Sequence, residues 1–245
     1  MNQGLRLARV SLLVMASLGA ASCGGGGGGG GAQSPSGPSF DLAAGIASLS
    51  ASKVNATMSL SGTSNGFNVT GSAQLTQSVA TASTFSGASA LMQTTTVSGT
   101  GIQNDLNIPL LYSFVHYDSS AYATLGLDTN FNSVLEYAVA DSPIEFPSSV
   151  KAGDSAVLGT MTLYLDGERT EDTIQVSYVV IGDPENTDSV TVEVIDQYYG
   201  TLNGGQIYQF DYSLTATGSM SLQSLSITYP QTSGSSAGML LFTVQ

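Results

Sequence analysis

The 245-residue chain has one cysteine, one histidine and no tryptophan. A single cysteine cannot form a disulfide within the chain, so any folded domain must be stabilised by packing alone. One histidine and one cysteine also fall short of the several nitrogen and sulfur ligands that zinc sites usually need. The composition therefore excludes a disulfide-stapled domain and argues against a zinc site.

Charged residues are also scarce, at 9% of the chain, and the 5 Lys and Arg residues stand against 18 Asp and Glu. Nucleic-acid binding and electrostatic docking on anionic lipid both need clusters of Lys and Arg, so this composition argues against both. Apolar residues make up 42% of the chain, which is enough for a hydrophobic core. The polar surface must then consist mainly of uncharged side chains and glycine.

The N-terminal apolar run, residues 10–18, is far shorter than the about 20 residues that a transmembrane helix needs. It follows Arg6 and Arg9 and precedes small residues and Cys23, a pattern typical of a secretory signal peptide. The cut site resembles the lipobox of bacterial lipoproteins, and this resemblance implies that Cys23 is acylated. The alternative is an ordinary secreted protein with an unrelated cysteine. The lack of a disulfide partner favours lipidation.

Eight glycines, residues 24–31, follow Cys23, and Pro35 and Pro38 come next. Neither residue type favours packed structure here, so residues 24–39 predict a flexible tether. We expect a signal peptide at 1–22, a lipidated cysteine with its tether at 23–39, and one β-rich domain at 40–245. Glycine after Cys23 resembles a sorting signal for the outer membrane. The expected location is therefore the outer membrane, with the periplasmic face and the cell surface both open.

The spacing of Leu42, Ile46 and Leu49 predicts a short helix over residues 40–49, with Ser39 as a possible cap. From Lys53 onward apolar and polar residues alternate, which predicts strands separated by turn signals such as Asp166-Gly167. The expected strands cover residues 54–60, 67–75, 81–99, 106–117, 121–127, 134–140, 156–165, 174–181, 190–196, 207–215, 220–229 and 239–244. The predicted fold class is mainly β: an antiparallel meander forming a curled sheet, half-barrel or sandwich, with one short N-terminal helix.

A further resemblance rests on the cysteine-polyglycine tether and on two segments, Phe40-Asp41-Leu42-Ala43-Ala44 and residues 150–160. Residues 150–155 read VKAGDS and residues 158–160 read LGT. Together these features resemble a group of functionally uncharacterised proteobacterial lipoproteins. The resemblance implies lipidation and an all-β domain, and it carries no active site.

Residues 62–66 match the G-x-S-x-G pattern of hydrolases, with Ser64 as the nucleophile and Asp105 and His116 following it. A nucleophile elbow joins a strand to a helix, whereas this segment joins two predicted strands, so we expect no enzyme. We interpret His116 as a hydrogen-bonded structural residue of an apolar strand. The strand tyrosines, including Tyr178 and Tyr212, are interpreted as rings that bridge core and surface.

Four acidic residues are expected to meet at one rim of the sheet: Asp154, Asp183, Glu185 and Asp188. Asp154 precedes one predicted strand, and the other three follow the end of its antiparallel neighbour. Carboxylate oxygens suit Ca²⁺, so this rim is a hypothetical weak calcium site. A solvated acidic turn, with its repulsion eased by Lys151, is the alternative. No other cofactor is expected.

The sequence thus predicts an envelope lipoprotein, held on the membrane through acylated Cys23, with a non-catalytic binding or structural domain. It leaves the protein or small-molecule partner open. The alternative function is a lipid or lipoprotein carrier or chaperone whose curled sheet encloses an apolar cavity. An open concave side lined by Leu, Ile and Phe would favour the carrier.

Overall fold

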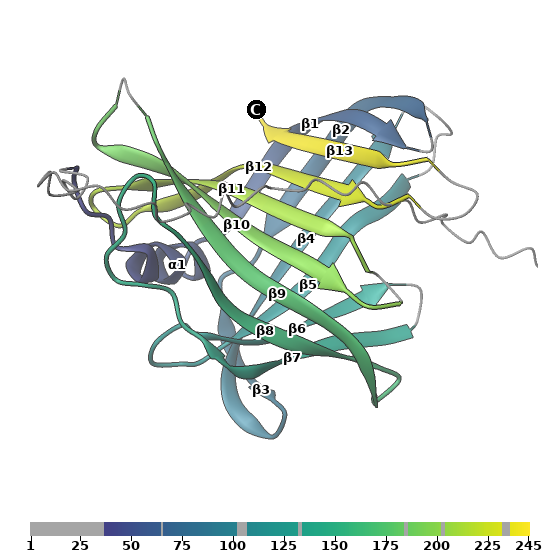
Figure 1. The fold of residues 1–245 in the computed structure, drawn as a ribbon, viewed down its shortest axis with the longest axis horizontal. Coiled ribbons are helices and arrows are strands. Elements are labelled where there is room, and N and C mark those ends of the chain that lie inside the picture. Colours follow the sequence, from purple (N-terminus) through teal and green to yellow (C-terminus); the bar gives the residue numbers. More distant parts are fainter. Residues whose placement is uncertain are drawn as a thin grey trace, which may run out of the picture.

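The fold is described from a computed structural model. The structure describes residues 37–64, 66–101, 107–131, 134–183, 186–201, 204–231 and 236–245. This part of the chain forms one helix and thirteen strands, coloured along the sequence in Figure 1. They are α1 (Leu42–Ser50), β1 (Val54–Ser64), β2 (Phe67–Gln77), β3 (Thr81–Phe85), β4 (Ala88–Gly101), β5 (Asn107–Tyr117), β6 (Thr124–Phe131), β7 (Val134–Ile144), β8 (Ser155–Leu165), β9 (Glu168–Gly182), β10 (Ser189–Tyr199), β11 (Ile207–Thr215), β12 (Met220–Tyr229) and β13 (Gly238–Val244).

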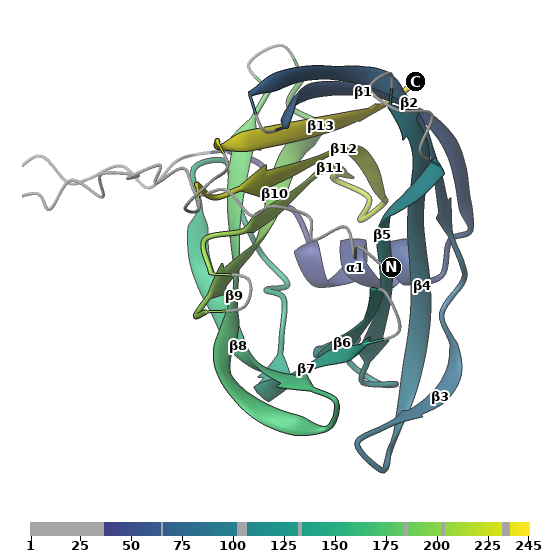
Figure 2. The same cartoon turned by 90° about the vertical axis from the view of Figure 1, so that its right-hand side faces the viewer.

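The strands form a closed antiparallel barrel of twelve strands, with β3 as an extra strand outside the ring. Consecutive strands from β4 to β13 pair in sequence order, and β13 then pairs with β1. The ring closes where residues 71–77 of β2 pair with residues 95–101 of β4, so that the chain skips β3. Figure 2 shows the strands surrounding the interior. The predicted meander with one helix is confirmed, and its curled sheet closes completely.

Side chains alternate between an apolar inner face and a polar outer face. On β9, Ile174, Val176 and Val180 are buried, whereas the intervening Gln175 and Ser177 are half-buried. The register of β9, β10 and β11 extends this alternation, because directly paired residues lie on the same face. The hydrophobic core therefore lies inside the barrel. No helix among the described residues is long and apolar enough to cross a membrane.

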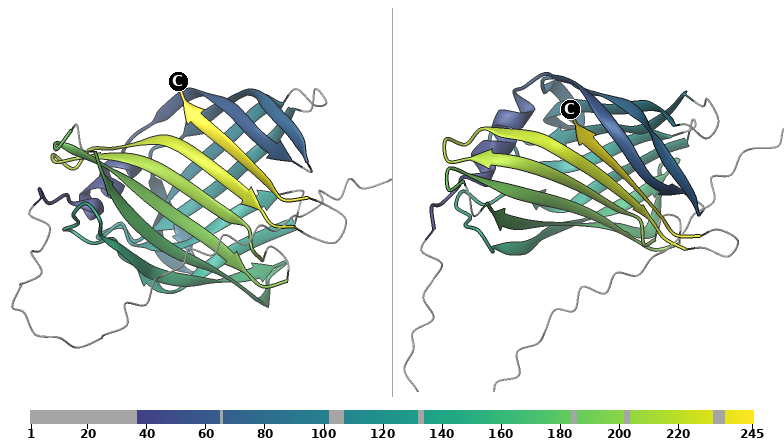
Figure 3. Two further views of the ribbon diagram at one scale, coloured as in Figure 1. Left: turned by 45° about the horizontal axis from the view of Figure 1, so that its top comes forward. Right: turned by 90° about the horizontal axis from the view of Figure 1, so that it is seen from above.

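Helix α1 lies at one end of the barrel, at the far end in the view of Figure 2 and at the left in Figure 3. Leu42, Ile46 and Leu49 are buried, as their helical spacing predicts. The N-cap is Asp41, whose side chain accepts a hydrogen bond from Ala44 N at 2.9 Å. The expected Ser39 cap was wrong: the Ser39 hydroxyl lies 2.7 Å from that of Ser149 instead.

Both ends of α1 are held by the barrel. Before the helix, Phe40 and Val150 exchange two backbone hydrogen bonds of 2.9 and 2.8 Å. At its C-terminus, the side-chain amides of Gln77 and Gln93 each donate to Leu49 O at 3.1 Å. These buried glutamines add to the bond that Leu49 O accepts from Ser52 N and so tie the last turn of the helix to β2 and β4. The helix is therefore fixed as a plug rather than resting on the outside of the domain.

Gly45 marks the closest approach of α1 to the wall. A Cβ at this position would lie 2.8 Å from Leu214 Cδ1 and 3.1 Å from Met220 Sδ. The glycine lowers helix propensity by about 1 kcal/mol relative to alanine. It is nevertheless the residue that lets the helix pack directly against β11 and β12.

Candidate ligand-binding interior

The middle of the barrel is lined by aromatic side chains that are not fully buried. Tyr208, Phe210 and Tyr212 of β11 pair with Asp196, Val194 and Val192 of β10. Val192 and Val194 are buried core residues, so the three aromatic side chains point inward as well. All three are only half-buried. Solvent therefore reaches the inner face of β11, although the neighbouring valines are closed off.

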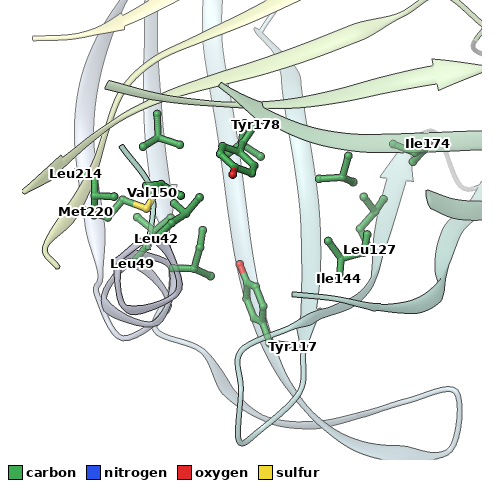
Figure 4. Close-up of a cluster of buried hydrophobic side chains, with 14 of the residues drawn as sticks. Leu42, Leu49, Tyr117, Leu127, Ile144, Val150, Ile174, Tyr178, Leu214 and Met220 are labelled. Carbon is green, nitrogen blue, oxygen red and sulfur yellow. The ribbon is translucent and has the colours of Figure 1, made fainter. Parts of the chain in front are cut away.

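The residues nearest α1 are packed more tightly. Leu42, Leu214 and Val150 have essentially no exposed surface, and Figure 4 shows them gathered beside the helix with Leu49 and Met220. The hydroxyl ends of Tyr117 and Tyr178 extend into the space between this group and a second group containing Leu127, Ile144 and Ile174 (Figure 4). The interior is thus dry and apolar at the plugged end and carries phenol groups further in.

Asp196 is the acidic residue of this inner wall. It pairs with Val176 of β9 and Tyr208 of β11, and lies two residues from buried Val194 and Tyr198 on the same strand. Its side chain is half-buried. The residue therefore lies on the inner side of the barrel and keeps some exposed surface.

Burial raises the pKa of the Asp196 carboxyl from 3.8 to about 7. The basic residues that the structure describes are Lys53, Lys151 and Arg169, and none of them forms a salt bridge with Asp196. Burial raises the pKa of Tyr117 and of Tyr212 well above the ordinary phenol value, and the negative charge of Asp196 adds to this shift. At neutral pH the group exists in both protonation states, able to pair with a cation or to donate a hydrogen bond.

A second inward acidic residue, Asp172, has a structural role. Its Oδ1 accepts a hydrogen bond from Thr201 N at 2.9 Å and lies near the Thr201 hydroxyl at 3.4 Å. It is 2% exposed. Among the described residues, Asp196 has no comparable backbone or side-chain donor, and burial is the cause of its raised pKa. The two carboxyls therefore differ in that protein donors satisfy Asp172, whereas Asp196 faces the accessible interior.

A chain of hydrogen bonds links the plug to this part of the interior. Gln93 donates to Leu49 O at the end of α1 and to Ser78 O at 2.9 Å. The Tyr117 hydroxyl donates to Gln93 Oε1 at 3.3 Å. The charge of Asp196 in turn acts on the Tyr117 hydroxyl and adds to the rise in its pKa. The polar groups inside the barrel are thus connected to the plug helix.

The sequence analysis missed Asp196, although the signal was present. Val190, Val192, Val194 and Asp196 share one parity, which places the acidic residue on the apolar face of its strand. The strand predicted from the sequence ends at residue 196. In the structure β10 continues to Tyr199. Tyr178 and Tyr212 also point into the barrel, so the interpretation that these rings bridge core and surface was wrong.

His116 lies on the outer face of β5, where its Nε2 is 2.9 Å from Asp128 Oδ2 on β6. Its ring stacks on Phe85 at a centroid distance of 4.3 Å, and the residue is 3% exposed. Gly126 admits this packing, because a Cβ there would lie 2.3 Å from the Phe85 ring. The predicted hydrogen bond of His116 is confirmed, although the ring faces outward under β3 rather than the core.

The structure does not bring the hydrolase residues together. Ser64 ends β1, a strand that starts beside α1, whereas His116 is near the end of β5 that returns towards α1. They therefore lie towards opposite ends of the barrel. Asp105 lies outside the described residues. The expectation that the protein is not an enzyme therefore remains a prediction from the sequence.

The acidic rim is only partly described, because Glu185 lies outside the described residues. Asp154 Oδ2 accepts a hydrogen bond from Lys151 N at 2.7 Å, and Asp188 N donates to Asn186 Oδ1 at 3.0 Å. Among the described residues, no three His, Cys, Asp or Glu side chains form a group suited to a metal ion. The calcium site stays a prediction. Millimolar Ca²⁺ should raise the melting temperature, and combined Asp183→Asn and Asp188→Asn substitutions should abolish that rise.

Cys23 and the tether up to residue 36 also lie outside the described residues, so lipidation rests on the sequence. Comparisons with family models, curated proteins and solved structures gave no match.

Proposed function

We propose that this protein is a membrane-anchored envelope lipoprotein that carries an amphipathic small molecule inside its barrel. The observation that carries the proposal is the accessible inner face of β11, formed by Tyr208, Phe210 and Tyr212. Half-buried aromatic residues inside a closed barrel are suited to contact an apolar ligand, because they offer large apolar area with little entropy to lose.

The distribution of side chains supports a carrier over a purely structural domain. A barrel with a filled interior has inward residues that are buried along its whole length. Here burial is complete near α1 and incomplete along β11. The outer faces of β2 and β12 carry Thr70, Ser72, Gln74, Ser224 and Ser226, so these two strands offer little apolar area for a protein partner; Val157, Ile181 and Met239 are exposed on other strands. This is the carrier function that the sequence left as an alternative.

Anchoring fits the same role. Two or three acyl chains on Cys23 would hold the protein on the membrane, because each buried CH₂ contributes about 0.8 kcal/mol. Glycine at position 24 supports the outer membrane as the location. A barrel on a flexible tether remains close to a lipid surface from which an amphipathic molecule can be taken up.

The test uses the mature chain, residues 23–245, with Cys23→Ser so that no acyl chain competes for the interior. N-phenyl-1-naphthylamine, an apolar probe whose fluorescence rises on leaving water, should bind saturably at one site. Phe210→Ala should weaken binding about three- to tenfold, because it removes inward apolar surface. Ser213→Ala changes an outward position on the same strand and should leave binding unchanged.

The native lipoprotein provides the second half of the test. Protein purified from detergent-solubilised envelopes should release a stoichiometric amphipathic molecule on denaturation, detected by mass spectrometry. Absence of saturable probe binding together with absence of a co-purified molecule would reject the carrier proposal. Equal effects of the inward and outward substitutions would also count against it.

A further inference from the structure

The inner wall around Asp196 combines one acidic group with several aromatic rings. Tyr208 is its direct cross-strand neighbour, Tyr198 lies two residues along β10, and Phe210 and Tyr212 follow on β11. The Tyr198 and Tyr208 rings are 5.6 Å apart between centroids and tilted by 54°. Those of Phe210 and Tyr212 are 6.4 Å apart and nearly parallel. The carboxyl is thus bordered by rings that differ in orientation.

A carboxyl bordered by aromatic rings is suited to bind a positively charged group of a ligand. The face of an aromatic ring attracts ammonium groups, and the attraction is largest where water is excluded. An ionised carboxyl inside the barrel lacks a protein cation among the described residues, so an ammonium ion would supply the missing counter-charge. The same carboxylate would repel the carboxylate of a fatty acid or the phosphate of an anionic lipid.

We propose that the barrel binds a cationic amphiphile, with its ammonium group held by Asp196 and the surrounding rings and its apolar chain directed along the inner wall. This inference rests on the proposed carrier function and names its ligand class. The apolar chain has an accessible surface to follow, since Phe210 and Tyr212 continue the same inner face along β11 and keep exposed surface.

Three ligands with the same ten-carbon chain separate the head group from the tail: decyltrimethylammonium, decanol and decanoate. Isothermal titration calorimetry of the mature Cys23→Ser chain, below the micelle-forming concentrations, gives their affinities. Decyltrimethylammonium should bind about tenfold or more tightly than decanol, and decanoate should bind most weakly.

Asp196→Asn keeps the shape of the side chain and removes its charge. It should weaken decyltrimethylammonium binding about tenfold and leave decanol binding unchanged within about twofold. Glu193→Gln is the matched control, since it removes one charge from an outward position of the same strand. Its affinities should equal those of the parent chain.

A pH series on the parent chain gives a readout that needs no substitution at Asp196. The titratable groups on the inner face around it are the Asp172 carboxyl on β9, which accepts a hydrogen bond from Thr201 N, and phenols. The phenols are those of Tyr117 on β5, Tyr178 on β9, Tyr198 on β10, and Tyr208 and Tyr212 on β11. Phenols ordinarily titrate near pH 10, above the range used. Affinity for decyltrimethylammonium, whose charge is fixed, should rise several-fold between pH 5.5 and 8.5, while affinity for decanol stays constant.

The outcomes separate the two proposals. If decanol and decyltrimethylammonium bind equally and Asp196→Asn changes neither affinity, the carrier function stands and the cationic ligand class is refuted. Preference for decanoate refutes the ligand class in the same way. If none of the three ligands binds and the fluorescent probe also fails, both proposals are rejected.

Discussion

Replacing Asp196 by asparagine should stabilise the protein at neutral and alkaline pH and have a smaller effect in acid. Burial raises the pKa of Asp196 from 3.8 to about 7, so between these values the folded protein holds a proton that the unfolded chain has released. The parent's free energy of unfolding therefore falls as pH rises from about 4 to about 7 on account of this group. The variant has no such group, and its advantage over the parent should grow over this range.

The magnitude follows from the pKa difference of about 3 between the folded and unfolded states. Each unit is worth about 1.4 kcal/mol, which gives about 4 kcal/mol in full. About 1.5 kcal/mol of this is already lost below pH 5, leaving about 2.5 kcal/mol between pH 5 and pH 8. Because the side chain is half-buried and partly hydrated, 2.5 kcal/mol is an upper value.

The assay is urea denaturation followed by far-UV circular dichroism at pH 5 and pH 8, on mature Cys23→Ser chains with and without Asp196→Asn. Subtracting the two proteins at each pH removes the contributions of all other titrating groups. Glu168→Gln removes one charge from an exposed position at the start of β9 and should give the same difference at both pH values. The same difference at both pH values for Asp196→Asn would refute a carboxyl buried inside the barrel.

Three further predictions concern the anchor and the plug. An alkyne fatty acid should label the wild-type protein in cells and spare Cys23→Ser; equal labelling would disprove acylation at this residue. Gly45→Val should cost about 2–3 kcal/mol by overpacking, whereas Ala44→Val, exposed on the same helix, should cost only its propensity; thermal melts measure both. Gln93→Leu should cost about 1–3 kcal/mol because it removes the donor to Ser78 O and the acceptor of the buried Tyr117 hydroxyl, and Gln74→Leu, exposed on β2, should be nearly neutral in the same melts.

Local patterns were enough to predict most strands and the helix. Apolar and polar residues alternate along β1 and β2, and the sequence therefore indicated this hairpin correctly. The segment 81–99 was expected to form strand, and it does, but a turn at Ser86 and Gly87 divides it into β3 and β4. Ser86 has a positive φ of 49°, a conformation that its residue type does not reveal.

The pairing of strands that lie far apart along the chain could not be predicted from the sequence. Whether a meander stays open or closes depends on pairs such as Met58 with Val244, which are distant along the chain and carry no local signal. The pairing of β2 with β4 across the skipped β3 is of the same kind. Once the ring is closed, side chains of one parity share an interior, and only then do Asp196 and Tyr117 become neighbours. The candidate site therefore forms only when the barrel closes. The sequence could show that each of its residues lies on the inward face of its own strand, but not that they come together.

The bridge between Phe40 and Val150 determines how mechanical force enters the domain. If Cys23 is acylated as proposed, a pull on that anchor reaches this bridge before it reaches α1. Two backbone hydrogen bonds, the contact between the Ser39 and Ser149 hydroxyls and the buried Phe40 ring transfer the load to the segment joining β7 to β8. The barrel wall thus bears the tension, and the helix inside it is shielded until the bridge breaks. A domain pulled through such an anchor would therefore keep α1 in place at the end of the barrel.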